Sequence, residues 1–298
     1  MRVGIIGIGN ICKKAYLPII TDIEDLELVL CTRNENTRKE ISKKYRIKEA
    51  VSTVDELIKK NIDCAFVHSS TKTHFSLCKT LLENGIHVYV DKPLSYNLDE
   101  SLELLSIAKK NNRILKVGFN RRNAPMIHDL KNMGHADIII MQKNRVSASL
   151  NPRVFLYDDF IHVLDTVRFL MGNDYKNIRV DALKDDKKLK NIVVTLSNST
   201  TTAIAIMNRD NGTNEENIEI MVSGKKAVVK SLTQTTFYEN NLTTVKDFGD
   251  WENTLYKRGF TSIIESFIEE VASGTISYDS LEDAIKSHKL CEEILELL

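Results

Sequence analysis

Apolar and polar residues alternate along the first 118 residues in a way that predicts strands and helices in turn. The strand-like runs are short and apolar: VGIIG, ELVLC, IDCAFVH, HVYV and ILKVGF. The longer segments between them, such as HFSLCKTLLENG and LDESLELLSIAKK, have the spacing of amphipathic helices. This alternation predicts parallel strands joined by crossover helices, with Pro18 expected to end or kink the first helix.

The pattern changes after about residue 175. Segments of period two follow one another, separated by breaks that contain Gly or Asn: NIVVTLSN, TTTAIAIMNR, ENIEIMVSG, KAVVKSL and TQTTFYEN. Two helical stretches, at about 253–272 and 280–298, close the chain. We therefore predict an α/β domain with a doubly wound parallel sheet over residues 1–120, followed by an α+β domain with a mostly antiparallel open sheet over residues 121–298.

Composition narrows the functional classes. The 298 residues carry 41 Lys and Arg against 41 Asp and Glu, so there is no basic excess to bind nucleic acid. No apolar run approaches the roughly 20 residues of a membrane span, and the chain start lacks the features of a secretory signal. The five cysteines are scattered and the histidines have no ligand spacing. We expect a cytoplasmic protein without a metal site.

A glycine-containing loop follows the first predicted strand and opens a helix. It reads Gly7-Ile8-Gly9-Asn10-Ile11-Cys12, which matches the first part of the dinucleotide fingerprint G-x-G-x-x-G. In this context backbone N–H groups and the helix dipole can hold a pyrophosphate, so the first domain is predicted to be a Rossmann domain. Cys12 stands where a third glycine would allow close packing, and a slightly displaced helix is expected.

The end of the second predicted strand bears on the choice of cofactor. Enzymes that prefer NAD usually place an acidic residue there to bind the ribose 2′-OH. This chain has Thr32 and Arg33 instead, which can hydrogen-bond and ion-pair with a 2′-phosphate. We therefore predict NADP as the preferred cofactor, with NAD as the alternative. The other interpretation of Arg33 is a solvated loop cation.

Three further motifs carry a resemblance to a known family. They are Val90-Asp91-Lys92-Pro93-Leu94, Gly118-Phe119-Asn120-Arg121-Arg122, and the segment from Asp158 to Asp165, DDFIHVLD. Together they resemble the glucose-fructose oxidoreductase, inositol dehydrogenase and MocA (Gfo/Idh/MocA) family, and within it the MviM-like branch. The resemblance covers nearly the whole chain. It implies a dehydrogenase or reductase that acts on a polyol, sugar, cyclitol or related small carbonyl compound.

The resemblance also implies the catalytic residues. Lys92 matches the lysine of the family's Glu-Lys-Pro motif, with Asp91 in place of Glu, and the family's Asp-x-x-x-His pair falls on Asp158 and His162. His162 would take the hydroxyl proton while Lys92 holds the oxygen and Asp158 orients the array. Asp159 competes with Asp158 for the carboxylate role. On a regular helix, Asp158, His162 and Asp165 would share one face.

Other positions carry weaker implications. Family positions suggest cofactor contacts from Ser69, Thr71 and His74, although a histidine at a helix start is often structural. Asn120, Arg121 and Arg122 follow the last strand of the first domain and are expected to face the cleft. For Arg121 and Arg122, binding of an acidic substrate and surface ion pairs are equally good interpretations. Phe160 stands where relatives commonly have Gly, and a ring there can reshape the substrate pocket.

Two alternative functions and an assembly remain open at this stage. The same fold can serve as a noncatalytic dinucleotide-binding regulator, or as a hydrolase that uses its dinucleotide only transiently to cleave glycosides. An antiparallel sheet with one uncovered face favours a homodimer or higher oligomer through that face. The remaining expected partner is the small-molecule substrate, with no nucleic acid and no membrane.

Overall fold

The computed structural model of the chain describes residues 1–172 and 174–298, which form two units. The first unit consists of Met1–Gly118 and Thr261–Lys286, and the second of Phe119–Phe260 and Ser287–Leu298. The chain thus leaves the first unit two residues before the boundary expected at residue 120. A single domain boundary does not describe the division, because Thr261–Lys286 returns to the first unit.

The first unit contains the predicted parallel sheet. Its strands are β1 (Arg2–Ile6), β2 (Glu27–Cys31), β3 (Glu49–Val51), β4 (Cys64–Val67), β5 (His87–Val90) and β6 (Leu115–Val117). They lie in the order β3-β2-β1-β4-β5-β6, and every neighbouring pair is parallel. The order reverses between β1 and β4, which is the position where doubly wound sheets bind ligands. The predicted fold class is confirmed.

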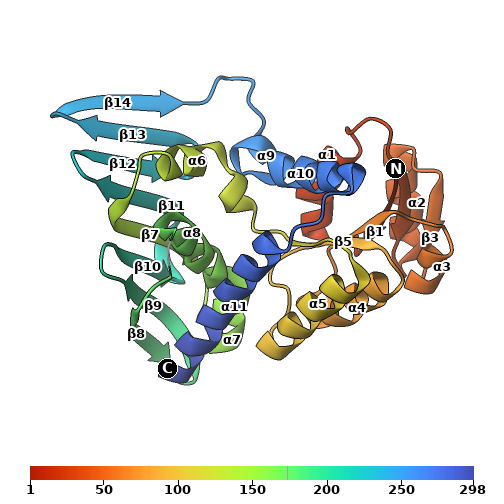
Figure 1. Ribbon diagram of the computed structural model, residues 1–298, viewed down its shortest axis with the longest axis horizontal. Coiled ribbons are helices and arrows are strands. Elements are labelled where there is room, and N and C mark those ends of the chain that lie inside the picture. Colours follow the sequence, from red (N-terminus) through yellow and green to blue (C-terminus); the bar gives the residue numbers. More distant parts are fainter. Residues whose placement is uncertain (173) are drawn as a thin grey trace. The chain divides into compact units, whose positions relative to one another are not determined.

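Helices cover both faces of this sheet (Figure 1). They are α1 (Leu17–Ile20), α2 (Glu35–Tyr45), α3 (Val54–Ile58), α4 (His74–Glu83), α5 (Leu98–Asn111) and α10 (Phe260–Ser273). In Figure 1, α4 and α5 lie on one side of β5 and α10 lies on the other. Buried apolar side chains on both faces explain why β4 and β5 read as continuous hydrophobic runs.

The helix after the glycine loop begins with a widened turn. Leu17 N–H bonds to the carbonyl of Cys12, five residues earlier, so Cys12–Tyr16 is a π-helical segment. Pro18 then lies in the first turn of α1, where its missing N–H leaves no intrahelical bond unmade. The break expected from Pro18 therefore comes before it, and Pro18 starts a helix instead of ending one.

Aromatic packing explains why α10 belongs to the first unit. The ring of Phe267 meets Phe66 at 5.2 Å and Tyr89 at 5.6 Å, both edge-on, and all three side chains are buried. Lys116 on β6 donates to Glu270 at 2.6 Å from the same helix. The sequence alone did not indicate this return, because nothing in the periodicity of a helix shows which sheet it covers.

The second unit contains an eight-stranded sheet. Its strands are β7 (Ala136–Val146), β8 (Asn177–Asp185), β9 (Lys188–Ser197), β10 (Thr202–Asn208), β11 (Asp210–Val222), β12 (Lys225–Lys230), β13 (Gln234–Glu239) and β14 (Leu242–Asp247). They lie in the order β14-β13-β12-β11-β7-β10-β9-β8. Only β7 and β10 pair in parallel, so the prediction of a mostly antiparallel sheet is confirmed.

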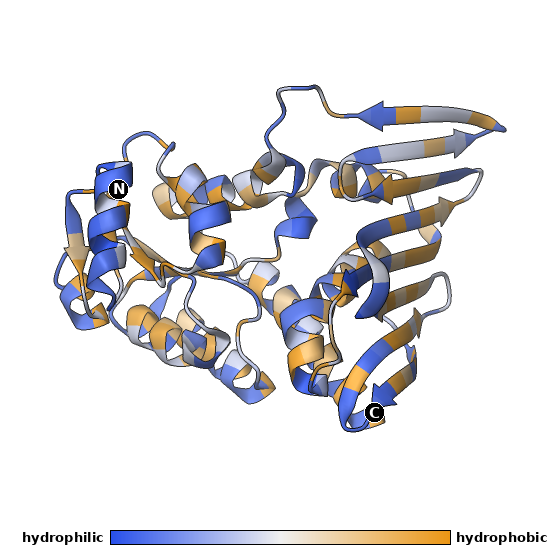
Figure 2. Cartoon of the chain, turned by 180° about the vertical axis from the view of Figure 1, so that it is seen from behind, coloured by the Kyte–Doolittle hydropathy of each residue, from blue (hydrophilic) through white to orange (hydrophobic). Residues whose placement is uncertain are grey.

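Helices cover one face of this sheet (Figure 1). They are α6 (Pro125–Lys131), α7 (Pro152–Val154) and α8 (Ile161–Met171), with α9 (Thr254–Lys257) beside α6 and the last helix α11 (Asp279–Leu297) extending into this unit. Figure 2 shows the strands banded by alternating apolar and polar residues. The apolar positions on the helix side, such as Ala203, Ala205 and Met207 of β10, are wholly buried.

Candidate active site

The glycine loop has the geometry that close approach of a ligand requires. Gly7 has φ +83°, and a Cβ there would lie 2.4 Å from the backbone nitrogen of Ser69, so only glycine fits. A Cβ on Gly9 would meet no atom within 4 Å, which leaves the space in front of the loop open. Its N–H groups lead directly into the helical turn that starts at Cys12. These features fit a bound pyrophosphate, and they bring Ser69 next to Gly7.

The loop after β2 is held by a residue that the sequence analysis missed. Arg38, in the first turns of α2, donates from Nη1 to the carbonyl of Thr32 and, at 3.0 Å, to that of Arg33. Asn34 caps the same helix by accepting from Thr37 N–H at 2.9 Å. Arg33 itself is exposed, as a residue that meets a phosphate from solvent should be. The signal for Arg38 was its place on the helix that starts at this loop.

His74 fastens the segment after β4 to the segment after β5. Its ring is buried, with Nδ1 2.8 Å from the carbonyl of Pro93 and Nε2 3.1 Å from the carbonyl of Ser69. Burial lowers the pKa of His74, so the neutral ring is favoured, and it donates to one of the two carbonyls. Thr71 lies nearby in the short 3₁₀ turn Thr71–Thr73. The histidine therefore acts on the main chain that carries two predicted contact residues.

Lys92 stands at the carboxyl end of β5, beside a buried polar cluster. Asp91 accepts from the Lys92 N–H at 3.0 Å and from the Tyr16 hydroxyl at 3.1 Å, and the Tyr89 hydroxyl lies 3.3 Å from that of Tyr16. Burial raises the pKa of Asp91, and the neighbouring Lys92 and Tyr16 oppose that rise. A Cβ on Gly118 would lie within 3.1 Å of both tyrosine hydroxyls, so glycine is needed there. Tyr16 and Gly118 were not predicted as part of this site.

The helix that carries Asp158 and His162 does not have a regular 3.6-residue spacing. Phe155–Phe160 form a π-helical segment, and α8 begins only at Ile161. The extra residue in this turn changes the register, so Asp158, His162 and Asp165 do not form the single polar face expected of an α-helix. Asp165 is buried and pairs with Arg122, while Asp158 and His162 are partly exposed.

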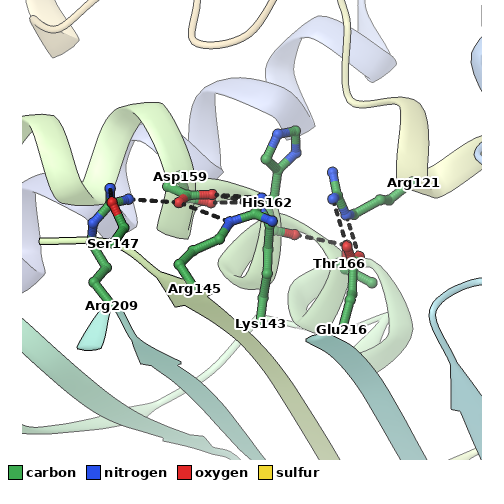
Figure 3. A network of polar contacts seen from close by, with 9 residues as sticks. All are labelled: Arg121, Lys143, Arg145, Ser147, Asp159, His162, Thr166, Arg209 and Glu216. Atoms are coloured by element: carbon green, nitrogen blue, oxygen red, sulfur yellow. Dashed lines mark hydrogen bonds and ion pairs between the residues drawn. The ribbon is translucent and has the colours of Figure 1, made fainter. Parts of the chain in front are cut away.

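Asp159 lies at the centre of a cluster of cations (Figure 3). Lys143 donates to its Oδ1, Arg209 to its Oδ2 at 2.8 Å, and Arg145 approaches at 3.4 Å. Burial raises the pKa of this carboxyl, but the charges of Lys143 and Arg145 outweigh burial and lower it far below its usual value. The cluster holds Asp159 ionised and gives it a structural role. Lys143, Arg145 and Arg209 were not predicted.

Asn120 and Arg121 are occupied by contacts within the second unit. Arg121 forms two hydrogen bonds to Glu216, at 2.5 and 2.8 Å, and both side chains are nearly inaccessible. Asn120 donates to the carbonyl of Arg258 at 2.7 Å. Of the two interpretations drawn from the sequence, these contacts favour the ion pair, although buried instead of on the surface. A substrate contact from either residue stays a prediction.

Phe160 points into the core. Its ring is fully buried and meets Phe155 edge-on at 6.2 Å, so in this structure it fills space under the helix. The pocket-reshaping role expected from the Gly position of relatives is not what this ring does. Val163, Val167 and Leu170 of α8 are buried as well, as expected from their apolar spacing with Phe160 along the helix.

Three structural findings concern absences within residues 1–172 and 174–298. No group of three or more His, Cys, Asp or Glu side chains is arranged to hold a metal ion. The five cysteines are free and buried. No described helix combines the length and apolarity needed to cross a bilayer.

Comparison with known proteins gives matches over both units. Residues 1–119 match the family model described as an oxidoreductase family with an NAD-binding Rossmann fold, and residues 125–240 match the C-terminal domain of YceM-like proteins. The chain is 30% identical to a putative oxidoreductase, YceM, of Salmonella typhimurium, over 99% of this chain and 97% of that protein.

Two further relatives extend the comparison. A solved structure of a dehydrogenase, MviM, from Clostridium difficile is 36% identical, with a TM-score of 0.94 over 100% of this chain and 99% of the other. The myo-inositol 2-dehydrogenase of Thermotoga maritima is 30% identical over 61% of this chain and 58% of the enzyme. The similarity therefore includes enzymes that oxidise or reduce small molecules.

Asp159→Asn is expected to destabilise the second unit. Removing the carboxylate leaves Lys143, Arg145 and Arg209 without their shared anion, and breaking a buried ion pair costs about 3 kcal/mol or more. Urea unfolding followed by circular dichroism measures this loss. Asp181→Asn, which removes an exposed carboxylate paired with Arg179, is the matched control and should change the midpoint little.

The stability difference between wild type and Asp159→Asn should depend on pH. Because the folded pKa of Asp159 lies below its unfolded value, its contribution is present above the unfolded pKa, near 3.8, and is lost as the pH falls toward the folded value. The difference between wild type and Asp159→Asn should thus shrink below about pH 4. A difference that is negligible at neutral pH would contradict the structural role.

Proposed function

Because the chain belongs to the Gfo/Idh/MocA family of oxidoreductases, we propose that it transfers a hydride between NADP(H) and a small polyol, sugar, cyclitol or related carbonyl compound. The observation that carries this proposal is the turn at Asp91 and Lys92, which ends β5 in the same unit as the Gly7 loop. In a doubly wound sheet, ligands bind outside the carboxyl ends of the strands. The inositol dehydrogenase among the relatives supports the substrate class.

We propose that the dinucleotide is bound along the first unit. The pyrophosphate would be held by the loop residues Gly7, Gly9, Asn10 and Ile11, with Ser69, Thr71 and His74 bordering the same groove. Thr32 and Arg33 would bind the 2′-phosphate of NADP. The contacts of Arg38 with the carbonyls of these two residues support the proposal, since they fix the loop in one conformation.

The chemistry follows from the ionisable side chains. When bound, the nicotinamide cofactor would supply the hydride-transfer chemistry. Lys92, with Asp91 behind it, donates to the substrate oxygen and stabilises negative charge that develops there. His162 takes the hydroxyl proton during oxidation and returns it during reduction, because its ordinary pKa lies near neutrality. Asp158 orients this array.

The choice of Asp158 over Asp159 rests on the contacts of the second carboxylate. Asp159 already accepts from Lys143 and Arg209 and faces Arg145. A carboxylate whose oxygens already face three cations is poorly placed to orient a separate proton-transfer residue. We therefore assign the positioning role to Asp158.

Lys92→Met tests the enzyme against its alternatives. Turnover should fall by at least about 100-fold, because an oxyanion-stabilising donor is lost, while the Kd for NADP, measured by fluorescence titration, should stay within about threefold of wild type. Lys110→Met, on the exposed face of α5, is the control and should leave both turnover and the Kd for NADP unchanged.

Two results would contradict the proposal in different ways. Wild-type protein that binds NADP but turns over no polyol or aldehyde in an absorbance assay would favour the noncatalytic regulator. Release of sugar from glycosides without net reduction of NADP would favour the hydrolase.

Cofactor preference has its own test. Wild-type kcat/KM should be higher with NADP than with NAD. Arg33→Ala should lower kcat/KM for NADP by about 10-fold or more and leave NAD nearly unchanged, because only NADP offers a charge for the guanidinium. Lys43→Ala, an exposed cation on α2, controls for the change in net charge. A wild-type preference for NAD would refute the assignment.

We also propose that the protein is a homodimer or a higher oligomer through the open face of the eight-stranded sheet. No described helix covers that face in Figure 1, and its centre carries a patch of partly exposed aliphatic side chains. The patch consists of Ile138, Ile140, Val193, Ile204 and Ile206, which the strand register makes neighbours. A contiguous apolar patch on a sheet face is typical of a protein interface.

Ile204→Glu should convert the oligomer to a monomer, because it introduces a charge at the centre of this patch. Light scattering on an eluting column peak measures the mass before and after the change. Leu183→Glu, at a 63% exposed position on the edge strand β8, is the control. A wild-type protein that is monomeric at micromolar concentration would remove this part of the proposal.

A further inference from the structure

The cations around Asp159 outnumber the carboxylates that they face. We call Lys143, Arg145 and Arg209 the basic cluster. Lys143 and Arg145 lie two residues apart on β7 and so project from the same face of the sheet, and Arg209 joins them between β10 and β11. Asp159 is the carboxylate that all three contact. Three positive charges thus surround one negative charge.

Neighbouring ion pairs leave this excess in place. Glu216 lies opposite Lys143 across the β7–β11 ladder, but both of its oxygens accept from Arg121. Asp210, at the start of β11, pairs with Lys190 at 2.8 Å. With Lys143 protonated, Arg121, Lys143, Arg145 and Arg209 face Asp159 and Glu216, a net charge of four minus two, or +2. A net charge at a mostly buried site is costly unless an anion joins it.

The pKa of Lys143 depends on burial and on the charges of the cluster. Its side chain is 2% exposed, and burial, together with the charge of Arg121, lowers its pKa to about 7 although Asp159 and Glu216 oppose the change. An added anion nearby would stabilise the ammonium form. Burial thus lowers the pKa of Lys143 most, and a further negative group beside it would oppose that change.

Arg145 is the arginine of the basic cluster whose N–H groups are engaged less closely. Arg209 uses Nε for the carbonyl of Ala148, Nη1 for Asp159 and Nη2 for the hydroxyl of Ser147. Among residues 1–172 and 174–298, Arg145, whose side chain is 36% exposed, makes two polar contacts, both at the long distance of 3.4 Å to Asp159. A guanidinium has five N–H donors arranged to bind carboxylate or phosphate in pairs. Arg145 thus offers a charged fork at the edge of the cluster.

The basic cluster adjoins the residue assigned to proton transfer. His162 lies three residues beyond Asp159, in the first turn of α8, and in Figure 3 its ring points away from the side of the helix on which Lys143 and Arg145 meet Asp159. We propose that Arg145, backed by Lys143 and Arg209, binds an anionic group of the substrate, a carboxylate or a phosphate. The inference rests on the proposed function and narrows it: the substrate is an acidic sugar or polyol derivative instead of a neutral one.

Anion binding to protein saturated with NADP tests this site without requiring turnover. The bound cofactor occupies any phosphate subsite at Arg33, so inorganic phosphate and acetate, titrated by calorimetry at constant ionic strength, report on other sites. Wild-type protein should bind one of them saturably, and the stronger ligand distinguishes a phosphate-bearing substrate from a carboxylate. Arg145→Met should weaken binding by about tenfold or more, as expected for loss of a charge-assisted contact.

Two further variants keep the test specific. Arg145→Lys retains the charge but not the fork, so its affinity should fall between wild type and Arg145→Met. Arg179→Met, which removes an exposed arginine paired with Asp181 on β8, makes the same change in net charge and should bind like wild type. Circular dichroism establishes that each variant is folded. No saturable binding to wild type, or equal binding to wild type and Arg145→Met, would overturn the proposal.

Turnover separates this inference from the proposed function. With NADP present, wild type should oxidise or reduce a sugar acid or sugar phosphate with a higher kcat/KM than the matching neutral sugar, and Arg145→Met should remove that advantage. Saturable phosphate binding that depends on Arg145 in a protein without dehydrogenase activity would refute the proposed function and leave the anion site standing. Turnover with equal kcat/KM for acidic and neutral substrates would refute the anion site and leave the proposed function standing.

Discussion

The ionised carboxylate of Asp159 is the interaction on which the polar end of the second unit depends. Lys143 is almost wholly removed from water, and a buried ammonium is tolerated only with an anion in contact. By pairing with cations from β7 and from the β10–β11 connection, Asp159 ties the π-helical segment to the sheet. The position of His162, one turn further along the helix, depends on that attachment. The residue proposed to move a proton thus stands on a charge network that itself does not react.

In the first unit, hydrogen bonds from His74 and Tyr16 hold the strand ends together. His74 joins the carbonyls of Ser69 and Pro93, and the Tyr16 hydroxyl joins the helix after the glycine loop to Asp91. Each contact connects one strand end to another, so the loop that fits a pyrophosphate and the turn that carries Lys92 are fixed together. Asp91, one methylene shorter than the Glu of relatives, is met by a tyrosine that reaches across to it. Gly118 leaves the room that this arrangement requires.

Local patterns made the fold predictable from the sequence, and long-range contacts set the limit. Strand runs and their alternation identified both sheets, because apolar periodicity directly reflects burial. The Gly7 loop was identifiable because its chemistry is confined to six consecutive residues. In contrast, Tyr16 and the basic cluster depend on pairings between elements that are distant in the sequence. The regular spacing assumed for Asp158, His162 and Asp165 failed for a different reason: helical periodicity presumes α-helical turns, and this helix begins with a wider one.

Wide turns of this kind adjoin proposed site residues in both units: Cys12–Tyr16 follows the Gly7 loop, and Phe155–Phe160 contains Asp158 and precedes His162. A π turn is an α-helix with one residue more than its hydrogen bonds need, so it records an insertion that the helix absorbed without breaking. Its cost in hydrogen bonding is local, whereas its geometric effect extends along the helix, since every preceding side chain is rotated relative to those that follow. Evolution can therefore turn a side chain toward or away from a ligand by a single codon, leaving the core on either side of the turn unchanged.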